Sequence, residues 1–415
     1  MRERKGPSRI PPAGPGADRP IAGALLGSRM PRLIELWRRR RGLVLDPESA
    51  GTLSWQEVEA VGPALLALQR GLTGGRALAG SGYMNDRDLL GAYLLYYWPV
   101  SYMQVSLALA ERGFSPRRVL DLGSGPGPAS AAVIDASSVR DPGSRLEELV
   151  LVDASRKALD LAESILDRGP CQSARVETME LDLESGADLP SGPFDLVVMG
   201  HCLNELWRGR SDALERRLGL VERAAERLAP DGRVLLVEPA LLATCRDLIG
   251  LRDRLSSRSW RILGPCPGSY PCPAFAAGPE RSCHAESPWQ APESVAALAK
   301  AAGLDRSSVK FAYFFLSPEA SISTKSDPAS PEDRRVVSES MLNKAGRLRY
   351  VLCGEGGLET ISARADDPEA REKGFMSLRR GDILRARGLE PRQGGGGLVS
   401  GTQLDLMGRA PEASP

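Results

Sequence analysis

The chain has 415 residues, of which 42% are hydrophobic and 26% are charged, and its formal net charge is +1. This composition suits one large or two medium globular domains. No apolar run approaches the roughly 20 residues that a helix needs to cross a bilayer, and the apolar stretch 21–27 is too short and too close to proline for a signal peptide. We therefore expect a cytoplasmic protein without a membrane contact, whose seven cysteines are thiols or metal ligands rather than disulfides.

Residues 1–41 form a basic segment. They contain eleven Lys or Arg and three acidic residues, and they end in four consecutive arginines, Arg38 to Arg41. A disordered arm of this charge suits a phosphate backbone, because each neutralised phosphate releases counterions. A solvated tail without a partner fits the charge equally well.

Residues 42–111 are expected to be helical. Apolar positions recur at helical spacing in 55–68 and again in 86–110. The second segment contains Trp98-Pro99, and a proline inside a helix removes a backbone hydrogen bond. We therefore predict one or two helices there, with the break at this pair.

From residue 112 the periodicity changes. Short apolar runs alternate with helical segments over 112–316, which predicts a parallel sheet covered by helices on both faces. The fold class indicated is α/β, with a Rossmann-like sheet of the class I methyltransferase type. The four runs are 118–121, 148–153, 194–199 and 232–238.

The C-terminal part is expected to add β structure. The apolar runs 309–316 and 348–353 predict a hairpin at the edge of the sheet. Residues 317–335 are rich in Ser, Pro and charged residues and predict a linker. Residues 336–407 predict a small β extension, whose short strands flank the glycine run 394–397.

A glycine-rich motif follows the first apolar run. The run ends at Asp121, and Gly123, Gly125 and Gly127 precede a helix of small residues. Glycines in this pattern let the backbone approach a nucleotide closely at the N-terminus of a helix. Dinucleotide and S-adenosylmethionine sites share the pattern, and the acid before the first glycine favours S-adenosylmethionine.

Two further acids extend the same candidate cofactor site. Asp153 ends the second run, where a carboxylate can accept hydrogen bonds from ribose hydroxyls. Asp182 lies near the end of the third strand region, where a contact with adenine is expected. Each of these aspartates could instead cap a helix or a turn.

The segment 200–206 follows the run 194–199, at the edge where open α/β sheets place their active crevice. His201 and Asn204 are therefore the candidate catalytic residues, although either could serve packing alone. The Asn/Asp-Pro-Pro-aromatic motif of enzymes that methylate amino groups in nucleic acids is absent, so no target amine is implied. Methyl transfer depends mostly on alignment, and it needs a general base only when the acceptor loses its proton early.

A cysteine-rich insertion is expected at 264–284. Cys266, Cys272 and Cys283 lie in it without the close Cys-x-x-Cys pair of structural zinc sites. An irregular, proline-rich loop that holds thiolates rigidly favours an iron–sulfur cluster, with zinc as the alternative. Cys266 follows a proline, as the nucleophile of pyrimidine carbon-5 methylases does, but the neighbouring cysteines favour a ligand role.

A fourth metal ligand must come from elsewhere in the chain. Cys353 ends the run 348–353, and the predicted pairing of this run with 309–316 would bring it beside the sheet. His284 is the alternative ligand. A set of unrelated thiols is the remaining interpretation.

The chain resembles the methyltransferase-like family of the mitochondrial small ribosomal subunit and its bacterial relatives. The resemblance extends over residues 80–360, and the cysteine set is its most specific part. Gly268 is a departure, because relatives tend to have a histidine after Cys-Pro. The stretches that carry the resemblance are 88–104, 120–127, 264–284 and 350–353.

The resemblance implies a metal centre and a partner. In that family four cysteines hold a 4Fe-4S cluster, which by position implies Cys266, Cys272, Cys283 and Cys353 as ligands here. The family acts in assembly or translation competence of the small ribosomal subunit, so the expected partners are this subunit and its rRNA. We therefore expect an S-adenosylmethionine-binding, cluster-bearing methyltransferase acting there. The alternatives are a non-catalytic assembly factor and a small-molecule methyltransferase with a structural zinc site.

Overall fold

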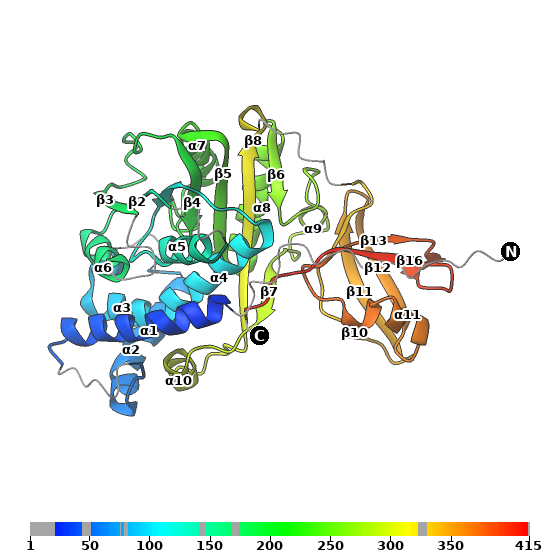
Figure 1. Ribbon diagram of the computed structural model, residues 1–415, viewed down its shortest axis with the longest axis horizontal. Coiled ribbons are helices and arrows are strands. Elements are labelled where there is room, and N and C mark those ends of the chain that lie inside the picture. Colours follow the sequence, from blue (N-terminus) through cyan, green and yellow to red (C-terminus); the bar gives the residue numbers. More distant parts are fainter. Residues whose placement is uncertain are drawn as a thin grey trace.

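A mostly parallel, eight-stranded sheet forms the centre of the computed structural model (Figure 1), which describes residues 21–43, 51–74, 76–78, 82–140, 146–167, 174–322 and 330–413. The strands of this first sheet are β1 (Arg118–Leu122), β2 (Glu148–Asp153), β3 (Arg175–Glu180), β4 (Phe194–Gly200), β5 (Leu228–Pro239), β6 (Trp260–Gly264), β7 (Ala285–Pro288) and β8 (Ser308–Pro318).

The strand order of the first sheet is β3-β2-β1-β4-β5-β8-β6, with β7 paired to β8. Strands β1 to β5 pair in parallel, whereas β8 runs antiparallel to both β5 and β6. The Rossmann-like α/β fold expected from the sequence is thereby confirmed. All four apolar runs that were predicted as strands form strands of this sheet.

Helices cover both faces of the first sheet. Helices α1 to α6 and α10 share one hydrophobic core, and α7 to α9 share a second core on the opposite face. Alternate strand residues enter the two cores, as Val119 and Leu120 do in β1, because side chains on a strand point to opposite faces in turn. The helices of the two faces are α1 (Ile21–Arg40), α2 (Trp55–Thr73), α3 (Arg87–Ala92), α4 (Trp98–Arg112), α5 (Pro128–Arg140), α6 (Arg156–Leu166), α7 (Ala213–Ala225), α8 (Leu242–Ser256), α9 (Pro273–Ala276) and α10 (Glu293–Ala301).

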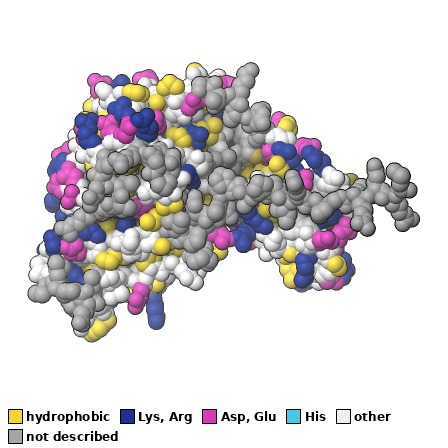
Figure 2. Space-filling model, viewed as in Figure 1, with side chains coloured by type: hydrophobic (Ala, Val, Ile, Leu, Met, Phe, Trp, Pro, Cys, Tyr) yellow, Lys and Arg dark blue, Asp and Glu magenta, His cyan; other side chains and the backbone are white. Residues whose placement is uncertain are grey.

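Charges of opposite sign lie together on the outer side of α7 and α8. Arg258 of the turn after α8 pairs with Glu222 of α7 at 2.8 Å, and Arg254 pairs with Glu215. Figure 2 shows dark-blue and magenta side chains intermingled in the upper part of the described surface. Exposed pairs of this kind contribute about 0–1 kcal/mol each. None of the described helices is long and apolar enough to span a membrane.

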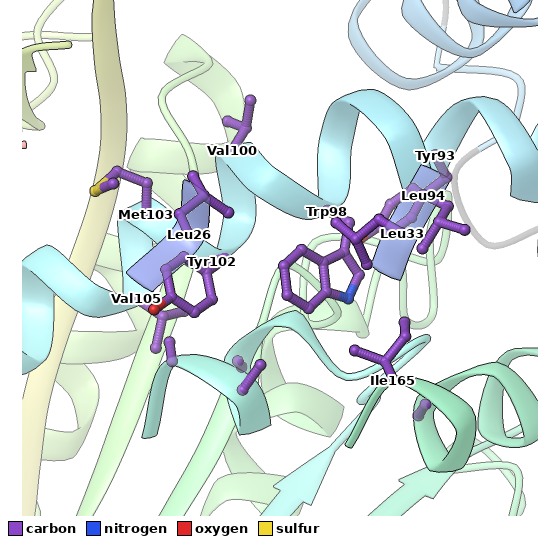
Figure 3. Close-up of a cluster of buried hydrophobic side chains, with 14 of the residues drawn as sticks. Leu26, Leu33, Tyr93, Leu94, Trp98, Val100, Tyr102, Met103, Val105 and Ile165 are labelled. Carbon is purple, nitrogen blue, oxygen red and sulfur yellow. The ribbon is translucent and has the colours of Figure 1, made fainter. Parts of the chain in front are cut away.

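Helix α1 corrects the prediction that residues 1–41 form a disordered arm. Leu26, Leu33 and Trp37 lie on one side of this helix and are buried against α4, α5 and α6, and Figure 3 shows the first two. Their spacing of about one and two turns gives a core-facing stripe. Residues 21–40 are therefore part of the first core, while residues 1–20 lie outside the described residues.

The arginines of α1 make ion pairs within the fold. Arg29 is 7% exposed and donates to Asp135 of α5 at 2.7 Å, and Arg38 donates to Glu57 of α2 at 2.6 Å. The pKa of Arg29 lies above its usual value, because the bonds and charge of Asp135 outweigh the opposite effect of burial. This part of the basic segment therefore offers much less positive charge to a phosphate backbone than its sequence suggests.

The helix over residues 87–112 does not break at Trp98-Pro99. It continues from α3 into α4 through the π-helical turn η3 (Tyr93–Tyr97), and Pro99 occupies the first turn of α4. A wider π turn leaves backbone groups without the usual α-helical partner, so the missing N–H of Pro99 costs less there. The Trp98 Nε1 donates to the Pro126 carbonyl at 2.9 Å, which joins this helix to the glycine motif.

A second sheet forms the C-terminal part, with a hydrophobic core of its own. Its strand order is β14-β15-β12-β11-β9-β13-β16, with β10 paired to β11. Its elements are β9 (Arg334–Val336), β10 (Met341–Leu342), β11 (Arg347–Gly354), β12 (Gly357–Arg364), α11 (Pro368–Glu372), β13 (Ile383–Arg387), β14 (Glu390–Arg392), β15 (Gly395–Gly397) and β16 (Gln403–Gly408).

The predicted hairpin between 309–316 and 348–353 is wrong. Strand β8 lies inside the first sheet between β5 and β6, whereas β11 pairs with β9 and β12 in the second sheet. Residues 311–317 of β8 are buried without interruption, as expected for a strand covered on both faces. The predicted linker 317–335 is shorter, because β8 continues to Pro318 and β9 begins at Arg334; residues 323–329 lie outside the described residues.

Buried polar contacts join the second sheet to the first. Arg335 of β9 donates to Glu111 of α4 and to the Pro265 carbonyl, each at 2.8 Å. The Ala413 backbone N–H donates to the Ser287 hydroxyl of β7 at 2.9 Å. Figure 1 shows the red C-terminal segment running back from β16 to the region of α1 and β7. The C-terminal part is therefore fixed at both of its ends.

Candidate functional site

The glycine motif forms a tight loop between β1 and α5. Gly123, Gly125 and Gly127 all have positive φ angles, of 70°, 51° and 74°, which disfavour residues with a side chain. The N–H groups of Gly123 and Ser124 donate to the Val152 carbonyl at 2.8 and 3.0 Å. These contacts hold the loop against the end of β2, as a nucleotide-binding loop requires.

A cavity of about 590 Å³ lies at the C-terminal ends of β1, β2 and β4. We call it the cofactor cavity. Of the predicted cofactor residues, Gly123, Gly125, Asp153 and Asp182 line it. The structure thus brings four predicted positions together at one edge of the sheet.

Gly127 and Asp121 are not among the lining residues of the cofactor cavity. Gly127 packs closely on α6, where a Cβ atom would lie 3.3 Å from that of Ala162. Asp121 is 1% exposed beneath the loop and accepts a hydrogen bond from the Ser130 hydroxyl at 2.6 Å. Burial raises the pKa of Asp121 to about 7. Both residues therefore support the loop from below.

The two other predicted acids differ in their surroundings. Asp153 accepts hydrogen bonds from the N–H groups of Gly125 and Ser155, both at 2.8 Å, and burial raises its pKa. Asp182 is exposed and caps a turn by accepting from the Glu184 N–H at 2.8 Å. Asp153 is thus fixed by the glycine loop itself, whereas Asp182 lies at the rim of the cavity.

The two candidate catalytic residues both line the cofactor cavity, but Asn204 uses its side chain elsewhere. Its Nδ2 donates to Glu238 at 2.6 Å and to the His201 carbonyl at 2.9 Å, and its Oδ1 accepts from Arg76. Asn204 therefore fits a positioning role. His201 has a φ of 64° and a buried Nε2 without a partner, and burial lowers its pKa to about 4. His201 is therefore neutral at physiological pH.

Glu238 gives the site a testable dependence on pH. Burial raises the pKa of Glu238 to about 8, against the opposing effect of its bonds from Asn204. A buried acid with a raised pKa stabilises the fold at low pH and loses this contribution as the pH rises through the folded-state value. Relative to Glu238→Gln, the free energy of unfolding of the wild type should fall by up to about 1.4 kcal/mol per pH unit between pH 4.5, the ordinary pKa of Glu, and about pH 8.

Urea unfolding at several pH values measures this difference for the two proteins. Glu59→Gln, a substitution of an exposed residue on α2, serves as the control and should not reproduce the slope. A difference between wild type and Glu238→Gln that stays constant from pH 5 to pH 9 would show that Glu238 does not titrate in this range.

The cofactor cavity also contains residues that the sequence analysis missed, and we call the part that they line its far end. Tyr93, Tyr97 and Gln104 lie on one face of the helix formed by η3 and α4, at intervals of one and two turns. Arg306 and Lys310, around the start of β8, line the same end. The aromatic run at 93–98 was the available signal, but nothing local links it to residues 200 positions later.

The four predicted metal ligands, Cys266, Cys272, Cys283 and Cys353, line a second cavity of about 260 Å³. We call it the cysteine cavity. It lies where α9 contacts β11 and β12, between the two sheets (Figure 1). Cys353 reaches it from the second sheet, and not through the pairing that the sequence analysis predicted. His284, the alternative ligand, also lines it.

The cysteine cavity has buried thiols and buried arginines. Burial, followed by the neighbouring Cys266, raises the pKa of Cys283 to about 12, and the pKa of Cys353 is raised for the same reasons. Arg252 and Arg335 line the cavity and are 0% and 6% exposed. Within the described part of the chain, no three His, Cys, Asp or Glu side chains converge closely enough to hold a single metal ion.

A match to a family model shows which protein family this chain belongs to. The model described as mitochondrial small ribosomal subunit Rsm22 matches residues 90–361, which is well over half of the chain. The chain belongs to the Rsm22 family. The match includes the glycine motif and all four cysteines, and it ends within β12. Helices α1 and α2 and strands β13 to β16 therefore lie outside the part that the Rsm22 family model covers.

Solved structures of low sequence identity are similar to parts of this chain. No curated protein sequence matches the chain. The plantazolicin methyltransferase BpumL in complex with SAH is 11% identical, with 63% of this chain and 98% of that chain covered and a TM-score of 0.33. A Listeria monocytogenes protein assigned to the class I S-adenosylmethionine-dependent methyltransferases is 14% identical, with 74% and 90% covered and a TM-score of 0.37. The ribosomal protein L11 methylase of Lactobacillus delbrueckii subsp. bulgaricus is 15% identical, with 53% and 78% covered and a TM-score of 0.30.

Proposed function

We propose that this Rsm22 family protein binds S-adenosylmethionine in the cofactor cavity. The observation that carries the proposal is the loop of Gly123 and Gly125 beside Asp153, at the edge of the sheet where nucleotides bind. Asp153 would hold the ribose hydroxyls, and Asp182 with Leu183 would lie next to the adenine. Asp121 and Gly127 would act from beneath, by shaping the loop.

The chemistry proposed is methyl transfer. S-adenosylmethionine supplies a methyl group on a sulfonium sulfur, whose bond to carbon breaks as the acceptor lone pair forms its own. The protein's part is to align the two partners, which accounts for much of the catalysis of such displacements. His201 is neutral and would accept a hydrogen bond from the acceptor group at its buried Nε2, and Asn204 with Glu238 would fix the segment that carries it.

We further propose that the target is the small ribosomal subunit and its RNA. The description of the Rsm22 family model names this subunit, which supports the proposal without identifying the atom that is methylated. A role in subunit assembly without methyl transfer would use the same binding surfaces. The presence of a built cofactor cavity favours catalysis.

The cysteine cavity fits a 4Fe-4S cluster, for which we propose Cys266, Cys272, Cys283 and Cys353 as ligands. Four thiols around a cavity of about 260 Å³ match the ligand set of such a cluster. A single zinc ion, with Zn–S bonds of about 2.3 Å, is the alternative for the same ligands, and metal and sulfide analysis separates the two.

The deciding experiment is transfer of labelled methyl groups from S-adenosylmethionine to small ribosomal subunits isolated from a strain that lacks the gene. Anaerobically prepared protein should label the rRNA of these subunits. Label in small molecules only, without co-sedimentation with subunits, would contradict the ribosomal target. Tight binding to subunits without any label would establish the assembly role instead.

A further inference from the structure

We propose that the far end of the cofactor cavity is a subsite for one nucleotide of an RNA strand. Gln104 and two tyrosines would recognise the base, and Arg306 would recognise its phosphate. This inference rests on the proposed function and specifies how the acceptor is held. The residues concerned line the same cavity as the glycine loop, so a bound base would face the cofactor end.

Gln104 has an unused hydrogen-bond acceptor in this cavity. It is 5% exposed, and its Nε2 donates to the Lys310 carbonyl at 2.9 Å. Because a carbonyl only accepts, this bond determines which end of the amide is nitrogen. The Oε1 is therefore left buried with no partner among the residues that the structure describes, which is costly unless a ligand donates to it. A nucleobase carries N–H groups in its ring plane that can do so.

Two tyrosines give the same end of the cavity an aromatic wall. The rings of Tyr93 and Tyr97 stack with centroids 5.9 Å apart and an interplanar angle of 24°. Both come from the π-helical turn η3, a type of turn that occurs often at functional sites. Stacking of a base on an aromatic ring contributes about 1–3 kcal/mol without a preference for sequence.

Arg306 supplies a cation that lacks an anionic partner. Its guanidinium lies over the Tyr96 ring at 4.9 Å, and its Nε is buried without a hydrogen bond. Among the described residues no carboxylate forms an ion pair with it, whereas the neighbouring Lys310 pairs with Glu286 at 3.0 Å. A planar guanidinium without a carboxylate partner among the described residues suits a phosphate oxygen pair. A flat N–H donor next to an anion is the chemistry of a nucleotide, and the tyrosine wall favours a stacked base over the backbone amide of an acidic peptide.

Binding of cytidine 5′-monophosphate and of cytidine tests the subsite. The full chain is first saturated with S-adenosylhomocysteine, so that the adenosine end is filled, and ligand binding is then followed by ligand-observed NMR. Arg306→Met should lower the affinity for the monophosphate about tenfold and leave the affinity for cytidine unchanged, because only the phosphate contact is lost. Gln104→Met should lower the affinity for both ligands about tenfold. Arg349→Met, a substitution of an exposed residue on β11, is the matched control and should change neither.

The outcomes separate this inference from the cofactor proposal. Equal affinity of the wild type for cytidine and its monophosphate would overturn the subsite. An equal loss of affinity for the monophosphate in Arg306→Met and Arg349→Met would also overturn it. Displacement of the monophosphate by a triglutamate peptide, with the same dependence on Arg306, would assign the site to peptides. If S-adenosylhomocysteine does not bind, the cofactor proposal fails, and the same two variants still decide the subsite with the monophosphate alone.

Discussion

A Gly125→Arg variant should fold and yet bind S-adenosylhomocysteine at least about 100-fold more weakly than the wild type, a loss of about 2.7 kcal/mol. A Cβ atom at Gly125 meets only the Met84 Cε, at 3.6 Å, so there is room for it, but a long side chain there enters the cofactor cavity. Isothermal titration calorimetry measures the effect directly.

The positive φ of Gly125 requires a matched control for backbone strain. Gly113, at the end of α4, has a φ of 57° against 51° for Gly125, and a Cβ there meets nothing within 4 Å. Gly113→Arg therefore carries a similar strain, of about 1–2 kcal/mol, without blocking the cavity. It should bind S-adenosylhomocysteine as the wild type does. If Gly125→Arg also keeps its affinity, the cavity is not the cofactor site.

A Cys353→Ser variant should lose its metal and become less stable. Wild-type protein purified without oxygen is expected to contain iron and acid-labile sulfide in equal amounts, and the variant should retain less than about half of both. Ligation of metal contributes to folding, so we expect at least about 2 kcal/mol of destabilisation, or a fall in Tm of roughly 4–8 °C. Metal and sulfide analysis with thermal unfolding measures both effects.

Cys245→Ser is the control for loss of a buried thiol. Cys245 of α8 is fully buried but does not line the cysteine cavity, so this variant should keep its iron and sulfide whatever its stability. Zinc without sulfide in the wild type would contradict the cluster and favour a structural zinc site. Full iron content in Cys353→Ser would remove Cys353 from the ligand set.

The centre of the first sheet could be predicted because β1, β2, β4 and β5 contain apolar runs, whereas β3 is polar and largely exposed. Helix α1 could not, because its apolar positions are interspersed with arginines whose partners are distant in sequence. Arg29 and Asp135, for example, are 106 positions apart. The strands that pair with β8 could not be predicted either, since an apolar strand of this kind does not specify which strand pairs with it. Local patterns therefore indicated the elements, while tertiary contacts decided their arrangement.

In the candidate site, too, local patterns could be predicted and tertiary contacts could not. The glycine loop and Asp153 could be found because strand, loop and acid are close in sequence and each has a distinct residue type. Gln104 and Arg306 could not, because their place in the cavity depends on the bond between α4 and β8, whose partners are 206 positions apart. Asn204 lines the cavity, and its bond to Glu238 became visible only in the structure.

The hydrogen bond from Trp98 to the Pro126 carbonyl has a consequence for the reaction. The helix that carries Tyr97 and Gln104 is attached at Trp98 to the loop that would hold the cofactor. One rigid element therefore sets the separation between the two ends of the cavity. In a displacement, an error of about 1 Å in that separation can reduce the rate about 100-fold. Substitutions that loosen this helix should thus lower turnover while both ligands still bind.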